Sequence, residues 1–537
     1  MKAASLPWRR RTGVLAFLLA AAAAVLLAAL LVPGGARASS TQEMILQDDT
    51  ALIYSSPSQV QANLQTLKNM GVDRVRVSVV WSLVAPSPTA ALKPGFDATN
   101  PAAYPAGVWD RWDLIDLAAQ KLGIGVYFQP TAPAPTWATG PVVRNQGYRY
   151  TSKINGKLYG QFFQAVATRY DGHYPATDLA GKTAPLPRVS YWGIYNEPNI
   201  GGWTTPQWLK VRGREVEASP AIYRRMLDGA WRALTVTGHR HDTILIGETA
   251  AYGARAKGYG DSMDPLIFMR SLYCLSSRYT PLTGRSAATV GCPRAGSRLA
   301  FTRAHPGLFY ATGWAHHPYD FVHAPSFKRR DPNSASLSGI ARLEHGLDHA
   351  RRAYHKAARV PIYITEWGVQ SRNPNPFIKF SQAQQAEYLN QGEYMAFRNP
   401  RVRSFAQFLL VDDAPNTQYP VGSRAYWSTF DSGLLAYGSS QPKPAYYAFE
   451  LPLWLPKARH GQHVYVWAQI RPSSAARVGT LQFQARGAQT WSNVKQVTGT
   501  GAEGYVSTHV ALPSAGSLRL SWTGVGQTLY SRTAQVS

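Results

Sequence analysis

Between residues 44 and 449, eight short runs of β-branched and apolar residues alternate with amphipathic stretches. The strand candidates are residues 44–47, 74–80, 125–129, 189–195, 243–247, 313–317, 361–365 and 402–410. Helical patterns lie between them over residues 57–70, 109–122, 158–170, 220–237, 338–357 and 382–397. Such alternation is typical of βα units, which build a parallel sheet covered by helices. Because no strand is followed by a glycine-rich phosphate loop, eight repeats favour a closed (β/α)8 TIM barrel over an open doubly wound sheet.

The pattern changes near residue 455. Short alternating runs follow over residues 464–470, 481–485, 505–509, 518–522 and 528–536, separated by turns rich in Gly, Ser and Pro. This predicts a small all-β sandwich of the immunoglobulin or fibronectin kind. We therefore expect an N-terminal segment over residues 1–38, a barrel domain over 39–455 and a sandwich domain over 456–537. The sandwich would either pack against the barrel as a support or contact carbohydrate.

Two glutamates stand just past strand candidates that are far apart in sequence. Residues 191–199 read YWGIYNEPN and residues 361–368 read PIYITEWG, which places Glu197 and Glu366 after the fourth and seventh strands. In a barrel the carboxyl ends of the strands converge on one face, so the two carboxyl groups should lie close together. Cleavage of a glycosidic bond needs one carboxyl that donates a proton and another that attacks or stabilises the sugar carbon. A single strand-end glutamate is more often a surface or salt-bridged residue, but two together favour this chemistry.

The residues around the two glutamates resemble glycoside hydrolase clan A, the retaining (β/α)8 glycosidases, and most of all the cellulase-like families 5 and 39. Asn196, Glu197 and Pro198 are similar to the acid/base motif, and Glu366, Trp367 and Gly368 to the nucleophile motif. Further similarity lies in residues 71–81 (GVDRVRVSVVW), 135–138 (PTWA), 317–319 (HPY) and 433–449. The resemblance covers most of residues 44–450 and implies a catalytic barrel.

The resemblance also implies a role for each matching residue. Glu366 would attack the anomeric carbon, and Glu197 would protonate the departing oxygen and then activate water. The supporting residues would be Arg76 and Tyr319 beside the nucleophile, Asn196 at the sugar 2-hydroxyl, His317 at the sixth strand, and Trp137 in the sugar pocket. For this cycle the carboxyl groups should lie about 5 Å apart. Neither a metal nor an organic cofactor is expected.

One departure from the family pattern concerns the eighth strand. Many members of the clan carry a tryptophan at its end, whereas here the strand runs through Phe408 and Val411 into Asp412. We expect Trp427, in the following loop, to take the place of that tryptophan and stack on a sugar ring. Core packing is the alternative role for Trp427. Glu248 and Asp412, also at strand ends, would either bond sugar hydroxyls or neutralise nearby cations. We expect the inserts at 83–108 and 274–305 to wall the cleft.

The leading interpretation is a secreted retaining glycoside hydrolase that cleaves O-glycosidic bonds of a polysaccharide or oligosaccharide. A non-catalytic carbohydrate-binding or cell-wall-binding protein on the same scaffold is one alternative. A transglycosylase, which uses the same covalent intermediate, is another. The sugar, the linkage and the oligomeric state stay open at this level.

Residues 1–38 have the features of an export signal, namely a basic start ending at Arg11, an apolar run over 14–32, and an Ala-Arg-Ala cleavage site at 36–38. The apolar run approaches the length that spans a bilayer, so an uncleaved membrane anchor is the alternative. The only two cysteines, Cys274 and Cys292, are expected to form a disulfide in an oxidising compartment. We therefore expect an extracellular protein.

The chain is strongly basic, with a formal net charge of +26. A field of this sign attracts anionic surfaces, so association with cell wall or with membrane headgroups is one expectation. Past the N-terminus, however, the basic residues are scattered and do not form runs interleaved with aromatics. We therefore interpret the charge as a solvated surface and expect no nucleic-acid partner.

Overall fold

The structure is a computed structural model that describes residues 39, 41–143, 148–439, 441–471, 477–524 and 526–537. The expected export signal or anchor, residues 1–38, lies outside the described residues. Within the described part of the chain, no helix combines the length and the apolar character needed to cross a membrane.

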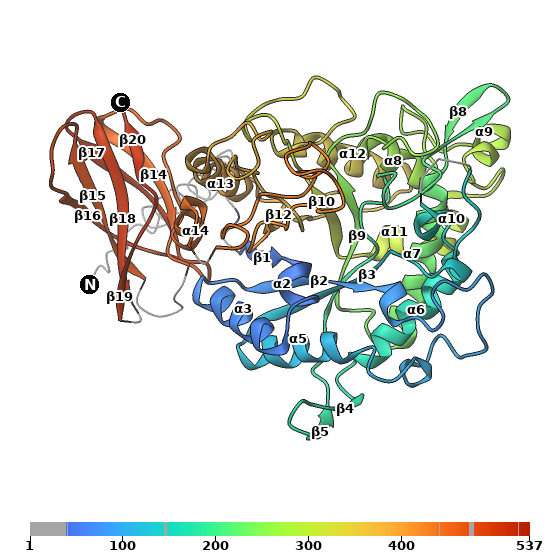
Figure 1. Cartoon of the computed structure of the whole chain (residues 1–537). Helices are drawn as coiled ribbons and strands as arrows, with labels where there is room; N and C mark the ends of the chain where they lie inside the picture. The colour runs from blue at the N-terminus through green and yellow to red at the C-terminus, as the bar shows by residue number, and fades with distance from the viewer. Residues whose placement is uncertain (1–38, 40, 144–147, 440, 472–476, 525) are drawn as a thin grey trace, which may run out of the picture.

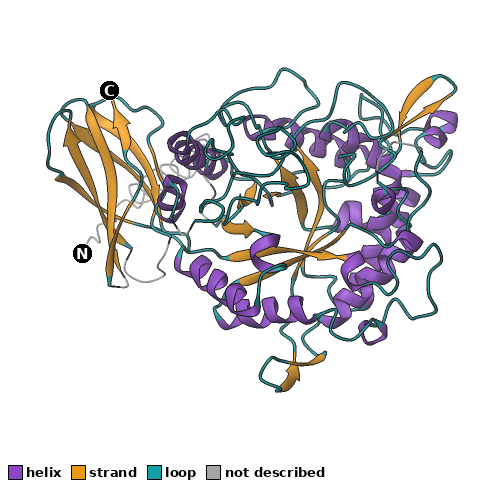
Figure 2. Cartoon of the chain, viewed as in Figure 1, coloured by secondary structure: helices purple, strands orange, loops and turns teal. Residues whose placement is uncertain are grey.

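Eight parallel strands close into a barrel, and they follow one another around it in chain order (Figures 1 and 2). They are β1 (Glu43–Gln47), β2 (Arg74–Val80), β3 (Gly125–Thr131), β6 (Tyr191–Gly193), β9 (Thr243–Ala250), β10 (Gly313–His317), β11 (Ile362–Ile364) and β12 (Val402–Phe408). Each coincides with one of the predicted strands, and only the ends differ. The predicted TIM barrel is therefore confirmed.

Helices follow the strands and cover the outside of the barrel (Figure 2). The main ones are α3 (Pro57–Asn69), α5 (Asp110–Lys121), α6 (Gly156–Arg169), α7 (Ser219–Val236), α8 (Pro265–Leu272), α12 (Ile340–Ala353) and α13 (Gln382–Phe397). Local sequence explains where they begin. Ser56 caps α3, with Pro57 in the first turn, and Ser381 and Gln384 form a reciprocal capping box at α13.

The two faces of β2 differ, with valines on the outer face of the barrel wall and arginines on the inner face. Val75, Val77 and Val79 belong to the large core between the sheet and the helices. Side chains alternate along a strand, so Arg74 and Arg76 lie on the opposite face, inside the barrel. The guanidinium of Arg74 stacks on the interior ring of Tyr191 at 4.1 Å. The sequence pattern of β2 thus places permanent cations inside the barrel, where they need carboxylate partners.

After α14 (Pro444–Glu450) the chain forms two antiparallel sheets around a core of their own. One sheet contains β13 (Leu453–Trp454), β14 (Gly461–Gln469) and β17 (Tyr505–Leu512). The other contains β15 (Val478–Ala485), β16 (Ser492–Thr498), β18 (Gly516–Gly524), β19 (Gln527–Tyr530) and β20 (Ala534–Val536). The predicted C-terminal all-β part is confirmed. The prediction missed β13 and the polar edge strand β16, and merged β19 with β20.

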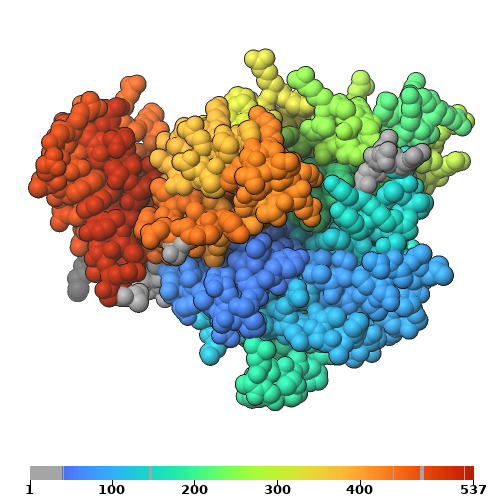
Figure 3. Space-filling view, in the orientation of Figure 1, coloured from blue at the N-terminus to red at the C-terminus, as the bar shows by residue number. Residues whose placement is uncertain are grey.

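The sandwich packs against the barrel and forms a smaller lobe beside it (Figure 3). Phe397 at the end of α13 contacts the rings of Trp467 and Tyr505. A buried ion pair joins Arg471 of the sandwich to Glu393 of α13 at 2.6 Å. Packing against the barrel, one of the two expected roles of the sandwich, is thus seen directly.

The predicted disulfide is present between Cys274 and Cys292, whose Cα atoms lie 5.8 Å apart. It closes a loop that follows α8. Two antiparallel hairpins, β4 (Pro175–Thr177) with β5 (Thr183–Pro185) and β7 (Trp208–Val211) with β8 (Arg214–Glu217), project from the barrel (Figure 1).

Candidate active site

Glu197 and Glu366 come together at the carboxyl ends of the barrel strands. Glu366 follows β11 and Glu197 follows β6. One oxygen of each carboxyl group and one ring nitrogen of His317 all lie within 4.8 Å of one another. The side chains of Glu197 and Glu366 are 15% and 10% exposed. Both can therefore be reached by a ligand while most of their surface is held by protein.

Arg76, fully buried on β2, is the cation at the centre of this group. Its Nη1 donates to Oε2 of Glu366 at 3.1 Å, and its Nη2 to Oε2 of Glu248 at 3.3 Å. Further acceptors are the side-chain oxygens of Asn196 at 2.7 Å, Gln129 at 2.9 Å, and Gln47. Burial alone would lower the pKa of Arg76, but the charges of Glu248 and Glu366 raise it. Arg76 is therefore a permanent positive charge beside Glu366.

Tyr319 holds the other oxygen of Glu366, since its hydroxyl donates to Oε1 at 3.0 Å. Burial and the neighbouring charge of Glu366 raise the pKa of Tyr319 well above its usual value, so the hydroxyl stays a donor. Burial also raises the pKa of Glu366, while the charges of His317 and Arg76 act in the opposite direction. Both oxygens of Glu366 are thus oriented by donors, which fixes the carboxyl plane.

His317, the last residue of β10, bridges the carboxyl groups. Its Nδ1 lies 2.9 Å from Oε1 of Glu197 and 3.6 Å from Oε2 of Glu366, and its Nε2 lies 3.0 Å from Oε2 of Glu248. Burial favours the neutral ring, but the charge of Glu366 and the hydrogen bonds to Glu197 and Glu248 raise the pKa of His317 to about 9. At neutral pH the ring is an imidazolium that donates from both nitrogens.

His316 shows how strand alternation separates two adjacent histidines. Its ring points away from the glutamates, and its nitrogens lie 2.9 Å from Oγ1 of Thr249 and 2.6 Å from the carbonyl of Ala335. Burial lowers the pKa of His316 to about 4, so this ring is neutral. These contacts hold the His316 ring against the neighbouring strand β9.

Glu248, on β9, is a fully buried carboxylate whose place in the site the sequence left open. It accepts from Arg76 and from His317, from Oγ1 of Thr365 at 2.7 Å, and from the hydroxyl of Tyr127. Burial alone would raise the pKa of Glu248, but Arg76 and His317 lower it. Of the two expected roles, neutralising cations is the one that the contacts support. Its position just past the predicted strand 243–247 was the only signal in the sequence, although β9 continues to Ala250 in the structure.

The segment that carries Asn196 and Glu197 is held against β9. The backbone N–H of Glu197 donates to the carbonyl of Glu248 at 3.0 Å. Glu197 and Glu248 both have positive φ, 37° and 45°, a conformation that costs side-chain-bearing residues about 1–3 kcal/mol. The side-chain oxygen of Asn196 accepts from Arg76, so its amide nitrogen is the end available to a ligand. The fold thus holds a strained backbone at Glu197 and at Glu248.

Glu197 and Glu366 line a cavity of about 380 Å³. Aromatic rings form much of its wall and come from Tyr252, Tyr319, Phe321 and Phe430. The remaining lining residues belong to the segments around Ile200, Ala250 and Ser262. The inserts 83–108 and 274–305, which we expected to wall the cleft, contribute none of the residues that line this cavity.

Neither of the two tryptophans expected at the sugar site lines this cavity. Trp137 is 8% exposed, packs edge-on against Trp81, and donates from its indole nitrogen to the carbonyl of Pro86. Trp427 is half-buried beside Tyr426, and neither tryptophan lines the cavity. The loop after β12 instead presents Phe430 to the cavity, a contact that the sequence did not predict because a loop residue carries no periodic signal.

Asp412 also lies outside the carboxyl cluster. It forms a buried ion pair with Lys443 at 2.9 Å and accepts from the backbone N–H of Gly433. Burial raises the pKa of Asp412 to about 6, against the opposing charge of Lys443. Neutralising a cation is the role that these contacts support.

Glu197, His317 and Glu366 have the spacing of a metal-binding cluster. A histidine ligand must be neutral, however, with a free lone pair directed at the metal. Both nitrogens of His317 face carboxylates, and its raised pKa keeps the ring protonated at neutral pH. In this structure the three side chains contact one another directly, with His317 between the carboxyl groups of Glu197 and Glu366.

No protein-family model and no curated protein sequence matches the chain. The solved structures that it resembles include an FMN-binding beta-glucuronidase from Facaelibacterium prausnitzii L2-6, with 11% identity over 93% of this chain and a TM-score of 0.39. This chain spans 56% of that protein's length. A glucosidase from Croceicoccus marinus has 12% identity over 93% of this chain and 81% of its own, with a TM-score of 0.44. Aphid myrosinase has 12% identity over 77% of this chain and 98% of its own, with a TM-score of 0.45.

Proposed function

We propose that the protein is a retaining glycoside hydrolase that acts on a carbohydrate by double displacement. The observation that carries this proposal is the distance of at most 4.8 Å between oxygens of Glu197 and Glu366. Carboxyl groups about 5 Å apart suit direct attack by one of them on the sugar, whereas an inverting enzyme needs about 6.5–9.5 Å to admit a water.

In the first step, an oxygen of Glu366 attacks the anomeric carbon and forms an ester bond. The bond from that carbon to the glycosidic oxygen breaks, and the leaving oxygen takes a proton from Glu197. In the second step, the Glu197 carboxylate removes a proton from water, whose oxygen attacks the same carbon. The bond to Glu366 then breaks and the carboxylate is regenerated.

The buried charges suit this cycle. When the ester forms, Glu366 loses its negative charge and Glu197 gains one. His317 lies 2.9 Å from Glu197 and 3.6 Å from Glu366, so its positive charge stabilises the carboxylate in either place. Because Arg76 and His317 face three carboxyl groups, the site is neutral when one carboxyl carries a proton, as the acid step requires.

We further propose that the protein works outside the cell. A disulfide between the only two cysteines, Cys274 and Cys292, suits an oxidising compartment. Residues 1–38 would supply the export signal or a membrane anchor, and the net charge of +26 would favour anionic cell-wall or membrane surfaces.

A panel of chromogenic β-glycosides and soluble polysaccharides tests the proposal. NMR identifies which anomer of the sugar is the initial product. We expect hydrolysis with retention, and a loss of at least about 10⁴-fold in kcat for Glu366→Gln at unchanged thermal stability. Release of the inverted anomer would contradict the mechanism. Sugar binding without any turnover would instead indicate a non-catalytic carbohydrate-binding protein, and transfer to added sugar acceptors a transglycosylase.

A further inference from the structure

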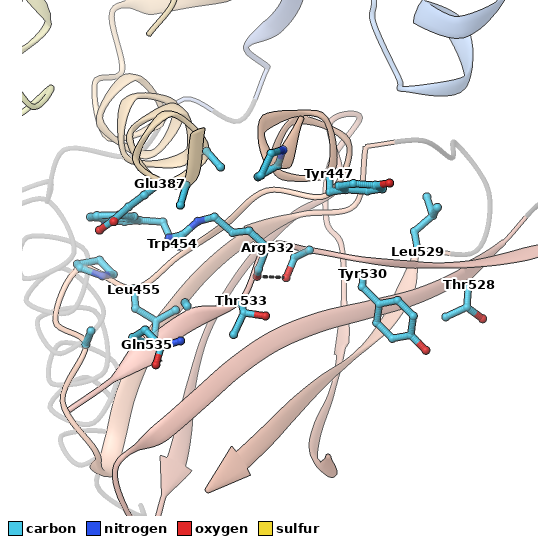
Figure 4. A pocket seen from close by; sticks show the side chains of 17 residues that line it. Glu387, Tyr447, Trp454, Leu455, Thr528, Leu529, Tyr530, Arg532, Thr533 and Gln535 are labelled. Atoms are coloured by element: carbon cyan, nitrogen blue, oxygen red, sulfur yellow. Dashed lines mark hydrogen bonds between the residues drawn. The ribbon is translucent and has the colours of Figure 1, made fainter. Parts of the chain in front are cut away.

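A second cavity, larger than the first, lies where the barrel meets the sandwich. We call it the junction groove; it has a volume of about 820 Å³ and shares no lining residue with the cavity at Glu197 and Glu366. Its walls come from α13, α14, the segment 454–458 and the C-terminal segment 528–535. Figure 4 shows side chains from both domains projecting into it. The groove therefore exists only because the two domains pack together.

Two exposed tyrosines stand at one end of the junction groove. Tyr447 of α14 is 46% exposed and Tyr530 of β19 is 43% exposed. Neighbouring groups hold both rings in place: Tyr446 lies edge-on to Tyr447, and the guanidinium of Arg519 lies 4.0 Å from the centre of the Tyr530 ring. Large aromatic surfaces that are exposed yet fixed are typical of binding sites, because little conformational entropy is lost when a ligand stacks on them.

Polar groups occupy the opposite end, where the side chain of Arg532 extends toward Trp454 and Glu387 (Figure 4). The Nε of Arg532 donates to Asn390 at 3.1 Å, and the guanidinium lies 5.6 Å from the Trp454 ring. Among the described residues, its two terminal nitrogens make no hydrogen bond, so Nε is the one donor of this side chain that is paired. A half-buried guanidinium with free donors thus lies beside an exposed carboxylate that can accept hydrogen bonds.

We propose that the junction groove is an auxiliary glycan-binding site that holds a segment of polysaccharide away from the catalytic cavity. Sugar rings present apolar C–H faces, which stack on aromatic rings, and hydroxyl groups, which both donate and accept hydrogen bonds. Tyr447 and Tyr530 would provide stacking surfaces, while Arg532 and Glu387 would contact hydroxyl groups. The choice of a glycan as the ligand rests on the proposed glycosidase function. The site would raise the local concentration of a polymeric substrate without taking part in bond cleavage.

Binding is measured by affinity electrophoresis of the full chain carrying Glu366→Gln, which removes turnover. The gels contain soluble β-glucan, glucomannan, arabinoxylan, arabinan or galactan. We expect at least one polymer to retard the protein, and Tyr447→Ala with Tyr530→Ala to weaken that binding by at least about fivefold, since both stacking surfaces are lost. Phe at both positions should preserve binding because the rings remain.

Tyr310→Ala serves as the matched control, because Tyr310 is 57% exposed and lies outside the groove. It should bind like the parent. In the active enzyme, the double alanine variant should lower kcat/KM on the polymer but not on a small chromogenic glycoside. Absence of binding to every polymer, or equal binding by parent and double variant, would overturn the proposal. If no glycoside is hydrolysed but the double variant still loses polymer binding, the junction groove is a glycan-binding site and the proposed glycosidase function is wrong.

Discussion

At the scale of single residues, the site is a set of charges buried together, and Glu248 connects them without lining the cavity. It contacts both Arg76 and His317 and has no exposed surface. A carboxylate in this place keeps two cations ionised in a region where burial opposes charge. We infer that Glu248 is a positioning residue that acts through His317.

Glu248→Gln tests that role. The amide keeps the shape but removes the charge, so the pKa of His317, now about 9, should fall. Because the imidazolium stabilises Glu197 and Glu366, the alkaline limb of the pH profile of kcat/KM should move about one unit toward lower pH. Asp412→Asn removes a buried carboxylate that is paired with Lys443 instead. Asp412→Asn should leave the shape of the pH profile unchanged. An unshifted profile for Glu248→Gln would contradict the positioning role of Glu248.

The raised pKa of His317 also predicts how the stability of the protein depends on pH. Its folded pKa of about 9 lies above the usual 6.5, so the folded state holds the proton more tightly than the unfolded state. The resulting stabilisation is fully present below about pH 6.5 and is lost as the pH rises through about 9. Chemical denaturation at pH 6.5 and pH 9.5 should show a larger loss of stability in the parent protein than in His317→Gln. Equal losses in the two proteins would count against the charged form of this ring.

At the scale of elements, Asp48 joins the first and last strands where the barrel closes. It follows β1 and caps α2 (Asp49–Leu52), accepting from the N–H of Ala51 at 2.8 Å. Its other oxygen accepts from the N–H groups of Leu410 and Val411, just past β12, at 3.1 and 3.0 Å. Backbone donors that follow the first and the last strand of the barrel thus meet on one buried carboxyl group.

We therefore expect Asp48→Ala to lower the free energy of unfolding by about 2–4 kcal/mol, because three backbone donors lose their acceptor. Urea denaturation measures the effect. Ser381→Ala, which removes only the cap of α13, should cost about 1 kcal/mol and serves as the reference. A loss for Asp48→Ala no larger than for Ser381→Ala would mean that the closure does not depend on this residue.

At the scale of the whole molecule, the barrel and the sandwich are coupled by the buried pair of Arg471 and Glu393. Glu393→Ala leaves a buried guanidinium unpaired and should destabilise the protein by about 3–5 kcal/mol. Adding Arg471→Met should recover much of that loss, because no buried charge then remains. Calorimetry should show one transition in the parent. Destabilisation of the double variant beyond the single one would contradict the coupling.

Much of the fold could be predicted because barrel strands are buried on both faces and read as apolar runs. Arg76, Glu197 and Glu366 lie in such runs or at their ends, so their positions along the chain already placed them on one face. The edge strand β16 was missed because five of its seven residues are polar and most are exposed. Phe430 was missed because a loop residue carries no periodic signal that shows where its ring points.

The sequence by itself determined the barrel and the position of two glutamates at strand ends, since both follow from local alternation and from the topology that alternation requires. Only the tertiary structure decided which side chains act together. Whether Glu248 neutralises cations or contacts sugar, whether Trp137 or Phe430 faces the cavity, and whether the domains enclose a groove depend on contacts between distant segments. Those contacts are set by packing and by charge neutralisation in the interior.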